Sequence, residues 1–172
     1  MIIRKCQKED ILKVSLFYDK VILYLDNHVN YPKWKYKIYP SILSVTKMTV
    51  EGYQYVCLDD NQNIIGSFVL NYDPEGSYFK VKWSKNIKKY MVIHAFAIDP
   101  SMHGKGIGTK ALEFCLEHAK KEGCEGIRLD VVPTNYPAKS FYEKNGFKYV
   151  SDVNLDRNIE DILLFSVFEL YF

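Results

Sequence analysis

The sequence has few cysteines, and they lack the spacing that a metal site or a disulfide framework requires. Cys6, Cys57, Cys115 and Cys124 lie far apart, and none belongs to a CxxC pair or to a cluster with histidine. In a chain of 172 residues this argues against a structural zinc site and against a disulfide scaffold. We expect four free, mostly buried thiols and no bound metal.

The chain also lacks a long hydrophobic run. Its longest apolar stretch, residues 162–172, is short and contains Glu169, whereas a membrane span needs about 20 apolar residues. The N-terminus turns polar at Arg4 and Lys5, unlike a secretory signal. We therefore expect a cytoplasmic protein without a membrane partner.

Neither sign of charge dominates, since 23 Lys and Arg residues stand against 21 Asp and Glu residues. This balance argues against a nucleic-acid partner. Residues 33–37 nevertheless interleave lysines with Trp34 and Tyr36, a pattern that can stack bases and contact phosphates. A second basic cluster consists of Lys80, Lys82, Lys85, Lys88 and Lys89. Such runs are usually solvated surfaces, so a nucleic-acid or ribosome-associated module is kept only as an alternative.

No linker, low-complexity segment or internal repeat divides the chain, and its length suits one core. A single domain over residues 1–172 is the prediction. The sequence leaves the oligomeric state open, and a homodimer is one assembly that it allows.

Apolar periodicity predicts a mixed α/β (α+β) fold with about four helices and six to seven strands. The first predicted helix follows a polar entry at residues 7–10 and ends near Leu25. The other three cover residues 42–50, 106–122 and 136–145. The predicted strands are residues 2–5, 53–58, 64–70, 91–98, 127–132, 147–150 and 162–172, with 78–83 a further strand or a loop.

Three glycines alternate directly before the clearest helix, in the segment His103-Gly-Lys-Gly-Ile-Gly-Thr109. Unpaired N–H groups at a helix start favour a bound anion, and glycines let a phosphate approach the backbone. A plain tight turn is the weaker alternative. The P-loop pattern is absent, and the dinucleotide fingerprint fails at Thr109, although Asp130 lies where a ribose-binding acid would sit.

Two motifs together resemble the GNAT superfamily of N-acetyltransferases. Residues 103–108 are similar to the family's acetyl-CoA motif, [Q/R]-x-x-G-x-[G/A], with His103 at the first position, Gly106 at the fourth and Gly108 at the last. Residues 135–147 resemble the family's N-x-x-A-x-x-x-Y-x-x-x-G-F. The resemblance is strong over residues 92–150, and both motifs stand in register with a helix, a strand and a second helix.

The resemblance implies a sheet that splays between its fourth and fifth strands and holds the pantetheine arm of acetyl-CoA there. The donor contacts would come from strand residues Phe96, Ala97 and Ile98 and from Asn135, Lys139 and Tyr142. The loop would add His103, Gly104, Lys105, Gly106, Ile107, Gly108 and Thr109. Tyr142 matches the family's general acid, which protonates the leaving thiolate; core packing is its alternative role.

Direct attack by an amine also requires a base. His94 lies on the central strand, and a histidine side chain accepts protons near neutrality; a hydrogen-bonded core residue is the equal alternative. Trp34, Tyr36, Tyr39 and Trp83 are candidate walls for the acceptor, with core or surface roles equally open. The acceptor would be a primary amine on a small molecule or a peptide N-terminus. A non-catalytic GNAT domain that binds CoA is the remaining alternative.

Overall fold

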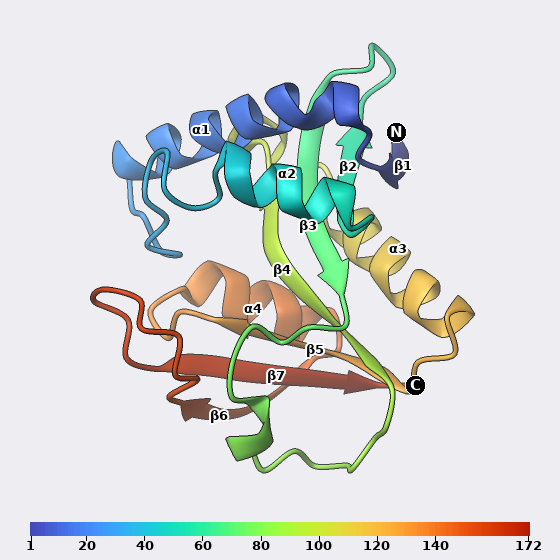
Figure 1. Cartoon of the computed structure of the whole chain (residues 1–172), viewed down its shortest axis with the longest axis vertical. Coiled ribbons are helices and arrows are strands. Elements are labelled where there is room, and N and C mark those ends of the chain that lie inside the picture. The colour runs from blue at the N-terminus through green and yellow to red at the C-terminus, as the bar shows by residue number, and fades with distance from the viewer. The chain divides into compact units, whose positions relative to one another are not determined.

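The computed structural model describes all residues, 1–172, and contains seven strands and four α-helices (Figure 1). The strands are β1 (Ile2–Lys5), β2 (Gln54–Leu58), β3 (Ile64–Asn71), β4 (Tyr90–Ile98), β5 (Gly126–Val131), β6 (Lys148–Val153) and β7 (Phe165–Tyr171). The α-helices are α1 (Ile11–Asp26), α2 (Ile42–Val50), α3 (Ile107–Lys121) and α4 (Tyr136–Lys144). Three single-turn 3-10 helices are η1 (Lys8–Asp10), η2 (Tyr78–Lys80) and η3 (Pro100–Met102).

The strands form one mixed sheet in the order β1-β2-β3-β4-β5-β7-β6. β4 and β5 pair in parallel, from Tyr90 opposite Gly126 to Ile93 opposite Leu129. The pairs β1–β2, β2–β3, β5–β7 and β6–β7 are antiparallel. This architecture confirms the predicted fold class, with its mixed sheet, parallel fourth and fifth strands and four helices.

The chain forms two compact units. The first comprises Met1–Leu70 and His94–Cys115, and the second comprises Asn71–Ile93 and Leu116–Phe172. β4 and α3 therefore each contribute residues to both units. The single domain over residues 1–172 stays a prediction.

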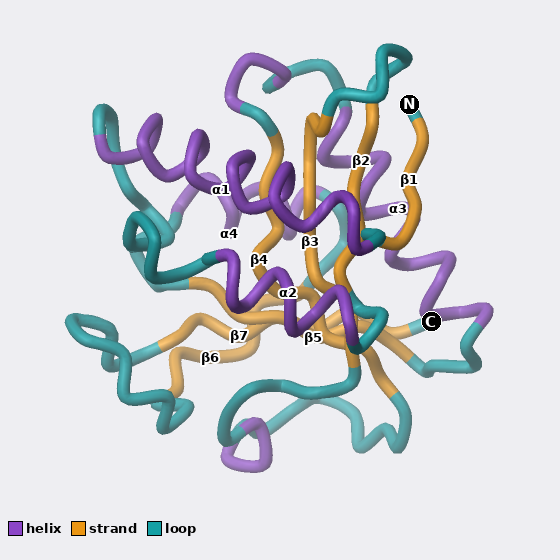
Figure 2. Tube along the Cα trace, turned by 45° about the horizontal axis from the view of Figure 1, so that its top comes forward, coloured by secondary structure: helices purple, strands orange, loops and turns teal.

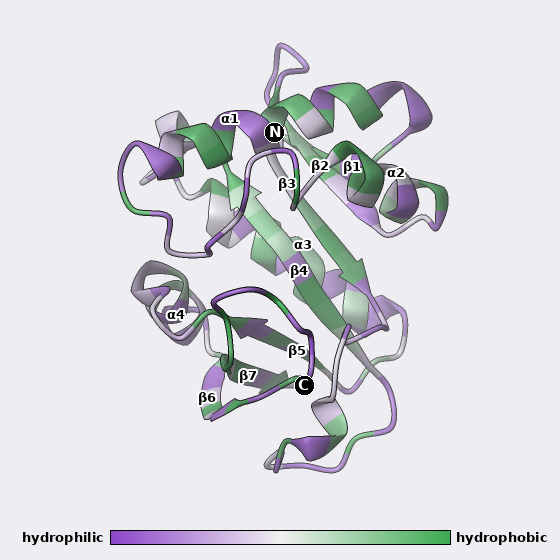
Figure 3. Cartoon of the chain, turned by 60° about the vertical axis from the view of Figure 1, so that its left-hand side comes forward, coloured by the Kyte–Doolittle hydropathy of each residue, from purple (hydrophilic) through white to green (hydrophobic).

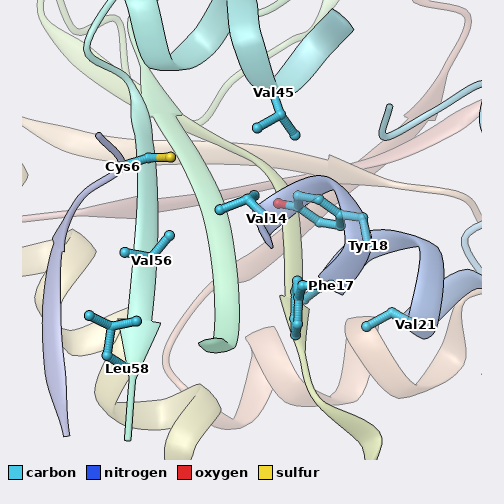
Figure 4. Close-up of a cluster of buried hydrophobic side chains, with 9 residues drawn as sticks. Cys6, Val14, Phe17, Tyr18, Val21, Val45, Val56 and Leu58 are labelled. Carbon is cyan, nitrogen blue, oxygen red and sulfur yellow. The ribbon is translucent and has the colours of Figure 1, made fainter. Parts of the chain in front are cut away.

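In the first unit, α1 and α2 cover β2 and β3 (Figures 1 and 2). α1 buries four residues that follow the helical spacing: Val14, Phe17, Tyr18 and Val21. Hydrophobic and hydrophilic residues alternate along α1, whereas β3 is mostly hydrophobic (Figure 3). Val45 of α2 points into the same cluster (Figure 4). Burial of these apolar side chains holds the two helices against the strands.

In the second unit, β5 lies between β4 and β7, and α4 packs beside β5, β7 and β6 (Figures 1 and 2). β5 begins at Gly126, where the backbones of β5 and β7 approach closely. A Cβ atom at this position would lie only 2.4 Å from the carbonyl oxygen of Leu170, so a larger residue would not fit. A buried apolar cluster consists of Tyr78, Val81, Val92, Val132, Leu155, Phe165 and Val167.

Most predicted elements are confirmed within a few residues. Of the two alternatives for residues 78–83, the structure has the loop, which begins with η2; the Trp83 indole N–H donates to the carbonyl of Tyr78 (3.1 Å) and folds the segment back on itself. The last strand begins at Phe165, since Ile162 instead bridges to Ile159 in the preceding loop. All four cysteines are free and buried, as expected. None of the helices combines the length and apolar character that a membrane crossing demands.

Candidate active site

The glycine loop needs glycine for its backbone conformation. Gly104 and Gly106 have φ of 76° and 74°, in the left-handed region that other residues rarely adopt. A Cβ atom at either position would meet no atom within 4 Å. The first backbone hydrogen bond of α3 runs from the Lys110 N–H to the Gly106 carbonyl (3.1 Å), so the N–H groups of residues 107–109 precede it. The loop therefore combines an open side with the donors of a helix start.

The remaining loop residues add charge without crowding the glycines. Gly108 lies in the first turn of α3, and His103 and Lys105 are exposed. The Lys105 ammonium lies 3.5 Å from the Met102 sulfur and pairs with no carboxylate in the structure. An anion at the loop would therefore meet a cation as well as backbone donors.

Asp99 fastens the start of this loop to the rest of the first unit. Its buried carboxylate accepts hydrogen bonds from the Ser101 backbone N–H (3.0 Å) and hydroxyl (2.8 Å), and it pairs with Lys20 of α1 at 2.5 Å. Its own N–H donates to the Ile65 carbonyl of β3 (2.9 Å). Burial by itself would raise the pKa of Asp99, but the hydrogen bonds from Lys20 and Ser101 outweigh burial and lower this pKa below its ordinary value.

β4 carries an unusual backbone conformation beside His94. His94 is buried, and the next residue, Ala95, has φ of 47°, which is rare for a residue other than glycine and costs on the order of 1–2 kcal/mol. The Tyr18 hydroxyl donates to the Ala95 carbonyl at 2.7 Å. Sequence reasoning did not single out Tyr18 or Ala95 as site residues, because an alanine inside an apolar run gives no signal of a turned backbone.

The three strand residues expected to contact the donor follow this point. The Phe96 ring stacks on Phe68 of β3 with centroids 5.6 Å apart. Gly66 of β3 lies so close that a Cβ atom there would be 2.8 Å from a side-chain carbon of Ile98 and 3.2 Å from the Ala97 carbonyl oxygen. Packing against β3 therefore fixes the end of β4 that precedes the glycine loop.

Tyr142, Asn135 and Lys139 belong to the second unit. Tyr142 is buried on α4, with its ring edge-on to Phe141 and Phe147. Asn135 caps α4, because its side-chain oxygen accepts from the Ala138 N–H (3.3 Å). The Lys139 ammonium lies over the Tyr149 ring. Each of these residues thus has a structural contact in addition to the role that the motif implies.

The candidate acceptor walls are divided between the units. Trp34 packs edge-on to Tyr18 in the first unit, and its backbone is held by Asn30, while Tyr36 and Tyr39 are exposed in the same loop. Trp83 belongs to the second unit, where its ring contacts the guanidinium of the buried Arg128 at 4.1 Å.

The structure also explains two features that sequence reasoning set aside. Asp130, the residue at the ribose-binding spacing, accepts two hydrogen bonds from Arg157 (2.6 and 2.7 Å) and one from the Tyr78 hydroxyl (2.7 Å), so its carboxylate serves the fold. Several lysines of the basic clusters are also engaged within the protein. Lys37 pairs with Asp19, Lys80 pairs with Asp156, and Lys89 donates to the Glu122 carbonyl.

The predicted site residues therefore fall into two groups. His94, Phe96, Ala97, Ile98, the glycine loop, Trp34 and Tyr39 lie in the first unit, and Asn135, Lys139, Tyr142 and Trp83 lie in the second. Within the first unit, Asp99 and its neighbours join the end of β4 to the loop. No group of three or more His, Cys, Asp or Glu residues with metal-binding geometry is present.

Comparison with known proteins identifies the family. The model of the acetyltransferase (GNAT) family matches residues 22–147, which is more than half of the chain. An uncharacterised N-acetyltransferase of Methanocaldococcus jannaschii is 40% identical over 68 residues, which cover 38% of this chain and 30% of that protein, so the chain spans less than a third of that relative's length.

Solved structures share the fold. A GNAT acetyltransferase from Streptococcus agalactiae has a TM-score of 0.81 at 18% identity, covering 99% of this chain and 95% of the other. An acetyltransferase from Bacillus anthracis, solved with acetyl coenzyme A, has a TM-score of 0.54 at 24% identity, covering 69% and 61%. With the glycine loop and the sheet as described, the match over residues 22–147 shows that this chain belongs to the GNAT acetyltransferase family.

Proposed function

We propose that the protein transfers an acetyl group from acetyl-CoA to a primary amine by direct attack. The observation that carries this proposal is the glycine loop directly before α3, in which Gly104 and Gly106 both have a positive φ. Membership in the GNAT family supports the reaction class. The fold shared with a structure solved in complex with acetyl coenzyme A supports the donor.

The donor would bind along the end of β4 and the loop. Its pyrophosphate would accept hydrogen bonds from backbone N–H groups of residues 104–109, with Lys105 adding positive charge. Backbone groups of Phe96, Ala97 and Ile98 would hold the pantetheine arm like an added strand, and Asn135 and Lys139 would supply further contacts. A backbone N–H of this strand would stabilise the negative charge that develops on the thioester oxygen.

Two side chains would handle the protons. At pH 7 only about one alkyl amine in 2,500 is unprotonated, given an ordinary pKa of ~10.4, so a base is needed. His94 would accept the proton that the amine loses as the C–N bond forms. Tyr142 would give its proton to the sulfur as the C–S bond breaks.

For the acceptor we propose a small molecule or a peptide N-terminus that binds against Trp34, Tyr39 and Trp83. The relative from Methanocaldococcus jannaschii, named an N-acetyltransferase, supports an amine as the acceptor. A nucleic-acid-binding role is less well supported, because Lys37 and Lys80 each pair with a carboxylate of the protein itself.

An acceptor screen tests the proposal. The purified protein is mixed with acetyl-CoA and, in separate wells, polyamines, amino acids, aminoglycosides and short peptides, and the release of free CoA is followed with a thiol reagent. Release that depends on one class of amine is expected. Binding of acetyl-CoA by calorimetry without release in any well would favour the non-catalytic CoA-binding alternative, and absence of binding would overturn the proposal.

A further inference from the structure

The backbone of β4 turns abruptly at Ala95. The preceding residues, from Tyr90 to Ile93, pair regularly with β5. Ala95 then adopts φ of 47°, in the left-handed region, although its side chain is not glycine. A residue in this conformation persists only where its surroundings fix it, and such residues gather at functional sites.

The contact that fixes Ala95 comes from α1, 77 positions earlier in the chain. The Tyr18 side chain is wholly buried, and its hydroxyl donates to the Ala95 carbonyl at 2.7 Å. Figure 4 shows the Tyr18 ring within the apolar cluster formed by Val14, Phe17 and Val45. A buried hydroxyl in apolar surroundings requires a partner, and here the partner is the carbonyl of the turned peptide.

A buried polar network holds Tyr18 in place. The Gln54 side-chain amide donates to the Tyr18 oxygen (3.3 Å), to the Ser67 hydroxyl oxygen (2.8 Å) and to the Phe68 carbonyl (3.2 Å). Ser67 in turn donates to the Tyr55 carbonyl (2.7 Å). Gln54 and Ser67 are both buried. The network therefore links α1, β2, β3 and the turned segment of β4, and it leaves the Tyr18 proton directed at Ala95.

The direction of one carbonyl sets the direction of the next N–H. A trans peptide is planar, with its C=O and N–H on opposite sides. Because the Ala95 carbonyl points toward Tyr18, the N–H of Phe96 points away from Tyr18. In the proposed function, Phe96 is one of the strand residues whose backbone groups bind the acetyl-CoA donor.

We propose that Tyr18 is a positioning residue, which holds the Ala95–Phe96 peptide turned and so aims the Phe96 N–H at the thioester oxygen of the donor. This inference rests on the proposed function. Tyr18 itself touches neither substrate. Its hydroxyl acts through the peptide, so its loss should weaken stabilisation of the transition state more than binding of the donor.

The test compares Tyr18→Phe with Tyr24→Phe, a partly exposed tyrosine on the same helix. Removing a donor to a developing oxyanion lowers kcat by about 10²–10³-fold, and misaiming one should cost part of this. We expect kcat of Tyr18→Phe to fall by roughly tenfold while the Kd of acetyl-CoA changes by less than about twofold. Tyr24→Phe should match the wild type. A kcat within about threefold of the wild type, per folded molecule, would overturn the proposal.

A second measurement needs no catalysis. In uncomplexed protein, Tyr18→Phe should change the amide ¹⁵N shift and hydrogen-exchange rate of Phe96, and Tyr24→Phe should not. If the wild type transfers no acetyl group although the Phe96 amide responds, the proposed function fails while the positional link stands. An unchanged amide overturns the link. If Tyr18→Phe does not fold, Gln54→Met replaces it, because it removes the amide that donates to the Tyr18 oxygen and keeps a side chain of similar length; a lower kcat at unchanged Kd is again expected, and an unchanged kcat overturns the proposal.

Discussion

The Lys20 ammonium on α1 lies 2.5 Å from a carboxylate oxygen of Asp99, at the point where β4 passes into the glycine loop. The same carboxylate accepts the Ser101 N–H and hydroxyl, so one side chain holds η3 and ties it to α1. The Lys20 side chain is 61% exposed, whereas that of Asp99 is 9% exposed. The carboxylate is therefore the half of the pair whose loss should matter more.

Asp99→Ala should lower the free energy of unfolding by about 1–2 kcal/mol, since it removes a capping acceptor and hydrogen bonds to a charged group. Lys20→Met, which keeps the aliphatic stem, should cost less than about 1 kcal/mol because the ammonium is largely solvated. Urea unfolding measures both. Equal costs for the two variants would show that the ion pair, rather than the cap, is what Asp99 contributes.

The same pair predicts a dependence on pH. The pKa of Asp99 lies below its ordinary value in the folded protein, so its stabilising effect is complete at neutral pH and is lost as the pH falls below about 4 toward the folded pKa. The stability difference between the wild type and Asp99→Asn should therefore shrink in acid. A difference that stays constant from pH 7 to the acid unfolding limit would contradict the lowered pKa.

Gly106→Glu should abolish binding of acetyl-CoA, because a side chain and a negative charge would both oppose the pyrophosphate. Gly123→Glu is the matched control. Gly123 also has a positive φ, of 71°, and open space around its Cβ position, but it lies at the other end of α3. Both variants should lose about 1–2 kcal/mol of stability through backbone strain. Calorimetry that finds the same affinity for the two folded variants would rule out the loop as the phosphate site.

Tyr142→Phe keeps the aromatic packing with Phe141 and Phe147 and removes only the hydroxyl. If Tyr142 protonates the leaving thiolate, kcat should fall by roughly 10²–10⁴-fold with little change in the Kd of acetyl-CoA. Tyr149→Phe, at an exposed tyrosine of β6, serves as the control. A loss smaller than about threefold would leave Tyr142 with a packing role alone.

His94→Ala tests the base through the pH–rate profile. With His94 as base, kcat/KM should show one rise with pH that depends on His94 and a second rise at the higher pKa of the acceptor amine. The variant should lose the lower rise and keep the upper one. A structural His94 predicts a lower melting temperature and an unaltered profile, so both are measured on one preparation.

Asp130→Asn should destabilise the protein by about 3 kcal/mol, because it leaves the Arg157 side chain, which is only 12% exposed, without its counter-charge. Asp156→Asn is the control in the adjoining loop, where the side chain is 48% exposed and pairs with Lys80; its cost should stay below about 1 kcal/mol. Thermal unfolding of the two variants gives the comparison. Arg157 also donates to the backbone carbonyls of Glu75 (2.6 Å) and Pro74 (2.7 Å). A cost for Asp130→Asn as small as that of Asp156→Asn would show that these two hydrogen bonds suffice to stabilise the guanidinium.

The sequence by itself determined the order of the elements and the loop. The helical spacing in α1 and α3, the apolar run in β4 and the alternation of apolar residues in β5 follow from local periodicity, which each segment carries in its own residues. The positive φ of Gly104 and Gly106 is likewise a local requirement that only glycine meets at low cost. These features could be predicted because they depend on neighbours in the chain.

Only the tertiary structure decided which residues hold the site in place. Tyr18 meets the Ala95 carbonyl across 77 positions, and Lys20 meets Asp99 across 79. Asp130 fits a ribose-binding spacing in the sequence, yet Arg157 and Tyr78 occupy its carboxylate. No periodicity encodes such pairs, because a buried polar group takes whatever partner the packing of distant segments brings to it.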